Sequence, residues 1–141
     1  MKGDTEGLHR VLSRTLEADP SDLVARNNLA LLSLLLGRDT DKTLSWTTDL
    51  YGKNSANALF ASTHAFALYK TGRTAEGIKV FEKLREDQLR NPSVAAYYGV
   101  LLAADGQVDK ARRFLDLAAR TTLLTEEQRL LADARRRVRA P

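Results

Sequence analysis

The side chains in this sequence most able to take part in catalysis or ligand binding are two histidines, His9 and His64, and two adjacent hydroxyl residues, Ser62 and Thr63. His64 could act as a general base, and Ser62 and Thr63 directly precede it. The sequence implies no acidic partner for the hydroxyls, and His64 falls on the side of a helix expected to pack inside a helical hairpin. We therefore predict a core histidine, no catalytic residue and no enzymatic activity.

Metal and cofactor sites are not predicted either. The sequence has no cysteine, which excludes disulfides, thiolate metal sites and cysteine nucleophiles within it. Neither His9 nor His64 has a second histidine or a carboxylate at a metal-ligand spacing. The sequence also has no phosphate-binding glycine loop and no nucleophile elbow. We expect no metal and no cofactor.

The charges are mixed along most of the chain, with 22 Lys and Arg against 18 Asp and Glu and a net charge of +4. Such mixing is typical of solvated helix faces. The exception is the run from Arg135 to Arg139, which could contact an acidic partner or nucleic acid. A solvated helix end is the favoured interpretation, because cations suit a helix C-terminus.

No apolar run approaches the roughly 18 to 20 residues that span a bilayer, and residues 1–6 lack the apolar core of a signal peptide. We expect a soluble chain without membrane insertion. The cytoplasm is the favoured compartment, and the periplasm stays open if a signal or anchor lies outside this sequence.

The helical segments that would position these side chains occur in a sequence repeat. Residues 67–78 and 101–112 match each other at an offset of 34, which aligns Gly72 with Gly106. Each glycine follows an apolar helix-like stretch and precedes an amphipathic one, as in a helix C-cap followed by a tight turn. Gly37 lies 35 residues before Gly72, so we expect one inserted residue near positions 39–42. The units therefore read as stacked helical hairpins.

The spacing of small and apolar residues supports these hairpins. Small residues stand where two helices must approach closely: Ala30, Ala65, Gly77, Gly99 and Ala111. Apolar residues at three- and four-residue spacing give each later second helix one buried stripe: Ile78, Phe81 and Leu84, then Phe114, Leu115 and Ala118.

At these residues the chain resembles the tetratricopeptide repeat (TPR) family, whose unit is a 34-residue antiparallel helix pair. The unit with Thr43 and Trp46 in its second helix is the weakest match. The resemblance implies an all-α, right-handed superhelix of helical hairpins, with about eight helices and no strand. We expect a single domain made of a half-repeat helix, three repeats and a capping helix, over residues 4–20, 23–57, 58–91, 92–125 and 125–139.

The sequence also predicts how the repeat array begins and ends. At the C-terminal end, Thr125 and Gln128 form a predicted capping box, with the Gln128 side chain reaching back to the Thr125 amide. At the N-terminal end, the start in mid-repeat favours a fragment of a larger repeat protein. A lone N-terminal capping helix is the alternative.

Stacked hairpins curve, so their first helices line a concave surface, which we call the inner face. The TPR resemblance places Asn27, Asn28 and Leu31 there, with Val24 and Leu34 beside them. In the second repeat it places Leu59, Ser62, Thr63, Phe66, Tyr69 and Lys70, and in the third Ser93, Tyr97 and Val100, with Ala96. Amides and aromatic rings suit a peptide or a partner's helix. For each residue, plain packing against neighbouring helices is an equal alternative.

The leading hypothesis is a protein-interaction scaffold that binds a peptide or protein segment on its inner face. The second is a structural or self-associating segment of a larger TPR protein, and nucleic-acid binding through the terminal arginines is a distant third. The chaperone-clamp subtype of the family is not favoured. Ser93 and Tyr97 stand where that subtype places cations, so a buried carboxylate would lack its charge partner.

Overall fold

Helices alone form the regular structure of residues 4–119 and 122–139, the part of the chain that this computed structural model describes. The expected all-α fold is confirmed. The helices of this part are α1 (Thr5–Ala18), α2 (Leu23–Leu35), α3 (Thr40–Lys53), α4 (Ala58–Lys70), α5 (Thr74–Glu82), α6 (Glu86–Leu89), α7 (Pro92–Ala104), α8 (Val108–Ala118) and α9 (Thr125–Arg139).

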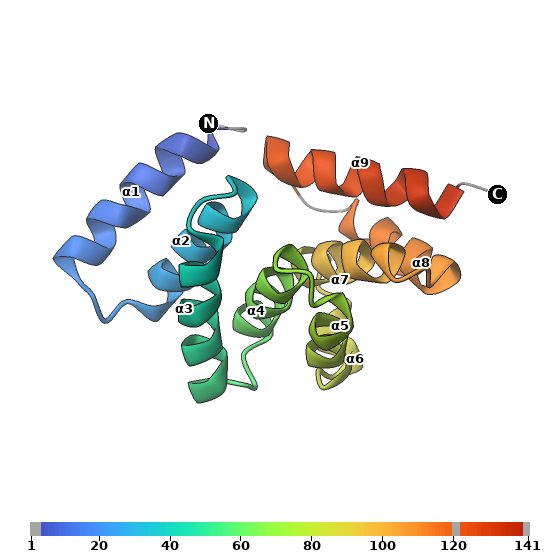
Figure 1. The fold of residues 1–141 in the computed structure, drawn as a ribbon, viewed down its shortest axis with the longest axis horizontal. Coiled ribbons are helices and arrows are strands. Elements are labelled where there is room, and N and C mark those ends of the chain that lie inside the picture. Colours follow the sequence, from blue (N-terminus) through green and yellow to red (C-terminus); the bar gives the residue numbers. More distant parts are fainter. Residues whose placement is uncertain (1–3, 120–121, 140–141) are drawn as a thin grey trace.

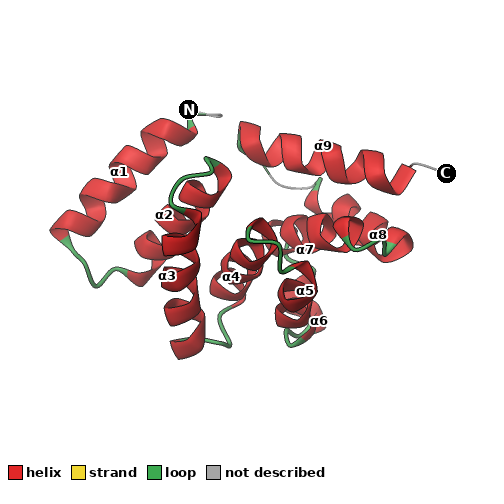
Figure 2. Cartoon of the chain, viewed as in Figure 1, coloured by secondary structure: helices red, strands yellow, loops and turns green. Residues whose placement is uncertain are grey.

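The helices stack as antiparallel hairpins. Helices α2 and α3, α4 and α5, and α7 and α8 pair with each other, and each first helix packs on the next, α2 on α4 and α4 on α7. Helix α1 packs on α2 at one end, and α9 packs on α7 and α8 at the other (Figure 1). Short loops connect the helices from α1 to α8 (Figure 2). The result is a superhelix of helical hairpins.

The hairpin turns repeat the same hydrogen bonds. Gly37, Gly72 and Gly106 have φ angles of +70°, +82° and +81°, in the left-handed region that favours glycine. In each turn the next residue's amide donates to a carbonyl five residues back, the bond that defines a Schellman cap. These bonds are Arg38 N to Ser33 O (2.9 Å), Arg73 N to Leu68 O (2.8 Å) and Gln107 N to Leu102 O (3.0 Å).

The predicted insertion lies in the first of these turns. Residues 36–39 separate α2 from α3, which is one residue more than the segments 71–73 and 105–107 in the later repeats. Asp39 absorbs the extra residue with a φ of +46°, a left-handed conformation that aspartate tolerates better than most residues.

The sequence predicts eight helices, and the described residues contain one more, the short helix α6 in the second repeat. Helix α5 ends at Glu82, and Arg85 then adopts an extended backbone (φ −72°, ψ 156°) before the single-turn helix α6. The Gln88 Oε1 atom accepts from the Arg85 amide at 3.0 Å and fixes the start of that turn. Leu84 thus lies outside the helix that was predicted to carry it, although it remains buried.

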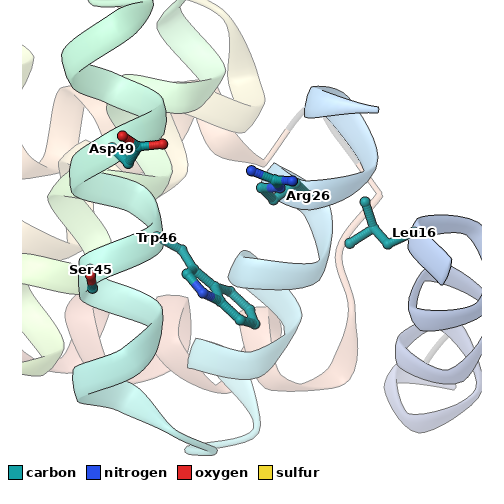
Figure 3. A pocket seen from close by; sticks show the side chains of 5 residues that line it. All are labelled: Leu16, Arg26, Ser45, Trp46 and Asp49. Atoms are coloured by element: carbon teal, nitrogen blue, oxygen red, sulfur yellow. The ribbon is translucent and has the colours of Figure 1, made fainter. Parts of the chain in front are cut away.

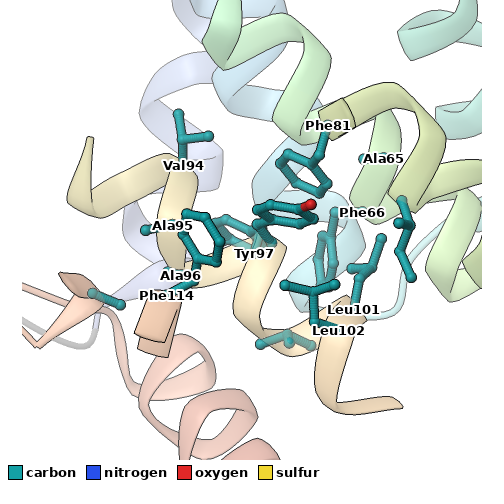
Figure 4. Packing of buried hydrophobic residues seen from close by; sticks show 14 of the residues in the cluster. Ala65, Phe66, Phe81, Val94, Ala95, Ala96, Tyr97, Leu101, Leu102 and Phe114 are labelled. Atoms are coloured by element: carbon teal, nitrogen blue, oxygen red, sulfur yellow. The ribbon is translucent and has the colours of Figure 1, made fainter. Parts of the chain in front are cut away.

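The core centres on aromatic rings contributed by successive helices (Figure 4). The ring centroid of Tyr98 in α7 lies 4.7 Å from that of Phe81 in α5 and 4.6 Å from that of Phe114 in α8. This aromatic column joins the second repeat to the third, and the predicted stripe residues Phe81 and Phe114 are buried in it.

Candidate binding surface

The inner face is built from equivalent positions of α2, α4 and α7. Residues three and four apart on a helix share one side, and the repeat offsets of 35 and 34 align these stripes across the three helices. Four rows result, each roughly one turn further along: Val24, Leu59 and Ser93; Asn28, Thr63 and Tyr97; Leu31, Phe66 and Val100; and Leu35, Lys70 and Ala104.

Helix α9 covers the middle of this face on α4 and α7. Phe66, Tyr97 and Val100 are 0%, 5% and 4% exposed. The Tyr97 hydroxyl donates to the Glu127 carboxylate of α9, and Leu130 of α9 lines small cavities together with Phe66 and with Val100. The Phe66 and Tyr97 rings also pack on each other, with centroids 4.8 Å apart. Tyr97 therefore bonds to the chain's own last helix, and Phe66 and Val100 lie beside that helix across small cavities.

The Tyr97 phenol is held as a donor. Burial raises the pKa of Tyr97 well above its ordinary value, and the charge of the Glu127 carboxylate raises it further. The buried, protonated phenol thus donates to the carboxylate of the half-buried Glu127, and such a charge-assisted bond is stronger than one between neutral groups.

Glu127 also fixes where α9 begins. Its Oε1 atom accepts from the Leu124 amide at 2.9 Å, so the backward reach of a capping box is made by Glu127 rather than by Gln128. The Gln128 side chain instead donates to the Leu123 carbonyl at 3.2 Å. The predicted box is therefore wrong by one residue, because Thr125 is already the first residue of the helix.

One part of the inner face stays open. Val24 and Leu59 are 59% and 48% exposed, and Asn28 and Ser93 are also exposed. Leu31 is half-buried beside them. These five residues are called the open patch below; Val24, Leu59 and Ser93 lie in the first turns of α2, α4 and α7, and Asn28 and Leu31 follow along α2. The patch combines aliphatic side chains with an amide that can both donate and accept.

The remaining predicted groove residues divide by burial. Tyr69 is half-buried and Lys70 is exposed. The other predicted groove residues are buried inside the repeats: Asn27, Leu34, Ser62, Thr63 and Ala96. The Oδ1 atom of Asn27 is buried and has no hydrogen-bond partner among the described residues. Packing, the alternative left open for each residue, thus accounts for this set.

His64 is a core residue, as the sequence predicts. It is 8% exposed, its Nδ1 atom lies 3.1 Å from the Thr47 hydroxyl, and its ring stacks on Tyr51 at 5.0 Å between centroids. Burial, followed by the nearby Arg73 charge, lowers the pKa of His64. A neutral ring that bridges α3 and α4 is a structural element of the first two repeats.

A further cavity lies away from the inner face, between α1, α2 and α3. It measures about 530 Å³, and Leu16, Arg26, Ser45, Trp46 and Asp49 line it (Figure 3). Side chains from all three helices point into the same space. The sequence indicated only that the repeat containing Trp46 departs from the family pattern, which did not predict a cavity.

The terminal arginines partly fasten α9 to the third repeat. Arg135 donates to the Leu115 carbonyl at 2.9 Å and lies 3.5 Å from the Asp116 carboxylate. Arg136 pairs with Asp133 within α9. Part of this cationic run is therefore engaged within the chain.

Comparisons with known proteins do not assign the chain to a family. No family model, no curated protein and no solved structure matches it. Within residues 4–119 and 122–139, no group of three or more histidine, cysteine or acidic residues could hold a metal ion. Across that same part of the chain, no helix has the length and apolar character to cross a membrane.

Proposed function

We propose that the chain is a non-catalytic protein-interaction scaffold of the tetratricopeptide-repeat type, whose open patch binds a peptide or protein segment. Val24 and Leu59 carry this proposal, because two large aliphatic side chains are exposed at equivalent positions of consecutive repeats, and the Asn28 amide is exposed one turn after Val24. Clustered exposed apolar residues rimmed by polar groups mark binding surfaces, and an amide suits the backbone of an extended peptide.

Peptides selected from a random display library on the immobilised chain provide the test. We expect Val24→Ala and Leu59→Ala each to weaken binding of the selected peptides by about tenfold, equivalent to about 1.4 kcal/mol, because each removes buried aliphatic contact at the centre of the interface. Leu23→Ala is the matched control, since Leu23 is 39% exposed and adjacent to Val24 but lies outside the open patch. Equal losses for all three variants would contradict the assignment.

Self-association is the second candidate, and α1 favours it. Leu8 and Val11 are 40% and 58% exposed on that helix, outside the inner face. Light scattering in the same experiment separates the two functions. A mass that grows with protein concentration, together with no selected peptide, would favour self-association.

A further inference from the structure

Helix α9 covers the third repeat and also reaches helices outside it. Its last turns cover the third repeat, where Ala134 and Val138 are buried. Its first turns pass beyond that repeat. Glu126 accepts from the Thr5 hydroxyl of α1 at 2.5 Å, and Leu130 shares a cavity with Phe66 of α4. Besides covering Tyr97 and Val100 of the neighbouring repeat, these first turns therefore also reach α1 and α4.

The surface beneath these turns has a defined chemistry. The Tyr97 hydroxyl is a buried donor, and Phe66 and Val100 supply apolar area. Helix α9 complements it with the Glu127 carboxylate and, three residues later, the Leu130 side chain. We call Phe66, Tyr97 and Val100 the seat. An acidic residue followed by leucine one turn later is the pattern that it accepts.

Helix α9 does not fill the seat completely. A cavity of about 190 Å³ remains between its first turns and α2 and α4, and one of about 40 Å³ remains beside Val100. The polar side chains of Arg129 and Asp133 line the first cavity, and Asp133 also lines the second. Both cavities are open to solvent along exposed side chains, Lys70 and Arg129 at the first and Asp133 at both, so a longer or bulkier side chain of another helix could fill space here that α9 leaves open.

We propose that the first turns of α9 are a ligand held in cis, and that a partner binds the seat by replacing them with its own amphipathic helix, which carries the same acid-to-leucine pattern. The proposal rests on the inner face being a binding surface. Release of α9 exposes the buried seat and extends the open patch along the inner face. Because a tethered ligand acts at a high effective concentration, α9 keeps the seat closed to weak ligands.

A labelled synthetic peptide of residues 122–139 tests this by fluorescence anisotropy with the full chain. The double variant Glu127→Ala and Leu130→Ala weakens the cis contacts and leaves the seat intact. We expect it to bind the peptide at least about tenfold more tightly than the unchanged chain does. A peptide that carries the same two substitutions should not bind. If the double variant keeps its helical circular dichroism but does not bind the peptide, α9 is only a cap and the proposal fails.

A reversible lock provides the second arm. Thr5→Cys and Glu126→Cys would be the only cysteines in the chain, so a reducible bifunctional thiol reagent can join α1 to α9 there. In the Glu127→Ala and Leu130→Ala background, the lock should abolish peptide binding and a reductant should restore it. Binding that survives the lock would place the peptide elsewhere and overturn the proposal.

The two proposals fail separately. Val24→Ala should leave binding of the α9 peptide unchanged, because Val24 lies in the open patch and not in the seat. If library peptides bind the open patch while the α9 peptide binds nowhere, the proposed function stands and the replacement of α9 is wrong.

Discussion

Alanine in place of Tyr98 is expected to lower the free energy of unfolding by about 3 to 5 kcal/mol. Tyr98 is 1% exposed, and its ring contacts both Phe81 and Phe114. Its removal opens a cavity at the point where α5, α7 and α8 meet. A loss of this size approaches the whole stability of a small domain, so failure of the variant to fold agrees with the expectation.

Urea unfolding of Tyr98→Ala beside Tyr69→Ala provides the measurement. Tyr69 is half-buried, and its ring lies 6.0 Å from that of Phe66, so its removal should cost much less. Tyr98→Leu keeps most of the apolar volume and should fall between the two. Equal losses at positions 98 and 69 would show that the aromatic column does not join the repeats.

Alanine in place of Gly77 is expected to destabilise the fold by about 1 to 3 kcal/mol, the usual cost of overpacking. A Cβ atom at Gly77 would lie 2.8 Å from the Ala65 carbonyl oxygen and 2.6 Å from the Leu101 Cδ2 atom. The leucine side chain can move aside. The backbone of α4 cannot do so unless α4 and α5 separate.

Gly52→Ala is the matched control, with an effect of the opposite sign. It also lies in a helix, α3, but a Cβ atom there meets nothing within 4 Å. Alanine should stabilise that helix by about 0.5 to 1 kcal/mol, since glycine loses more backbone entropy on folding. Chemical unfolding of both variants checks the pair. A gain in stability at Gly77 would contradict the close approach of the two helices.

The hairpins could be predicted from sequence because their signals are local. A turn glycine such as Gly72 needs only its own backbone conformation, and the spacing of Phe81 and Phe114 needs only the helical period. The helix α6 could not be predicted. It depends on an extended backbone at Arg85, and that conformation has no strong residue signature.

The inner face shows the other limit. The repeat offset predicted which residues align across α2, α4 and α7, but it could not predict which of them a distant helix covers. The contact between Tyr97 and Glu127 spans 30 residues, and the contact between Thr5 and Glu126 spans 121. Such contacts depend on the curvature of the whole superhelix, to which every hairpin contributes.

The distance between the starts of α1 and α9 tests the central claim, that α9 covers the middle of the inner face. Nitroxide labels at Glu6→Cys and Gln128→Cys occupy exposed positions next to Thr5 and close to Glu126, and the chain has no other cysteine. Double electron–electron resonance should give one narrow distribution of short distances. Labels at Glu17→Cys, near the far end of α1, and Gln128→Cys should give a longer distance. A broad or long distribution for the first pair would show that α9 does not lie across the inner face.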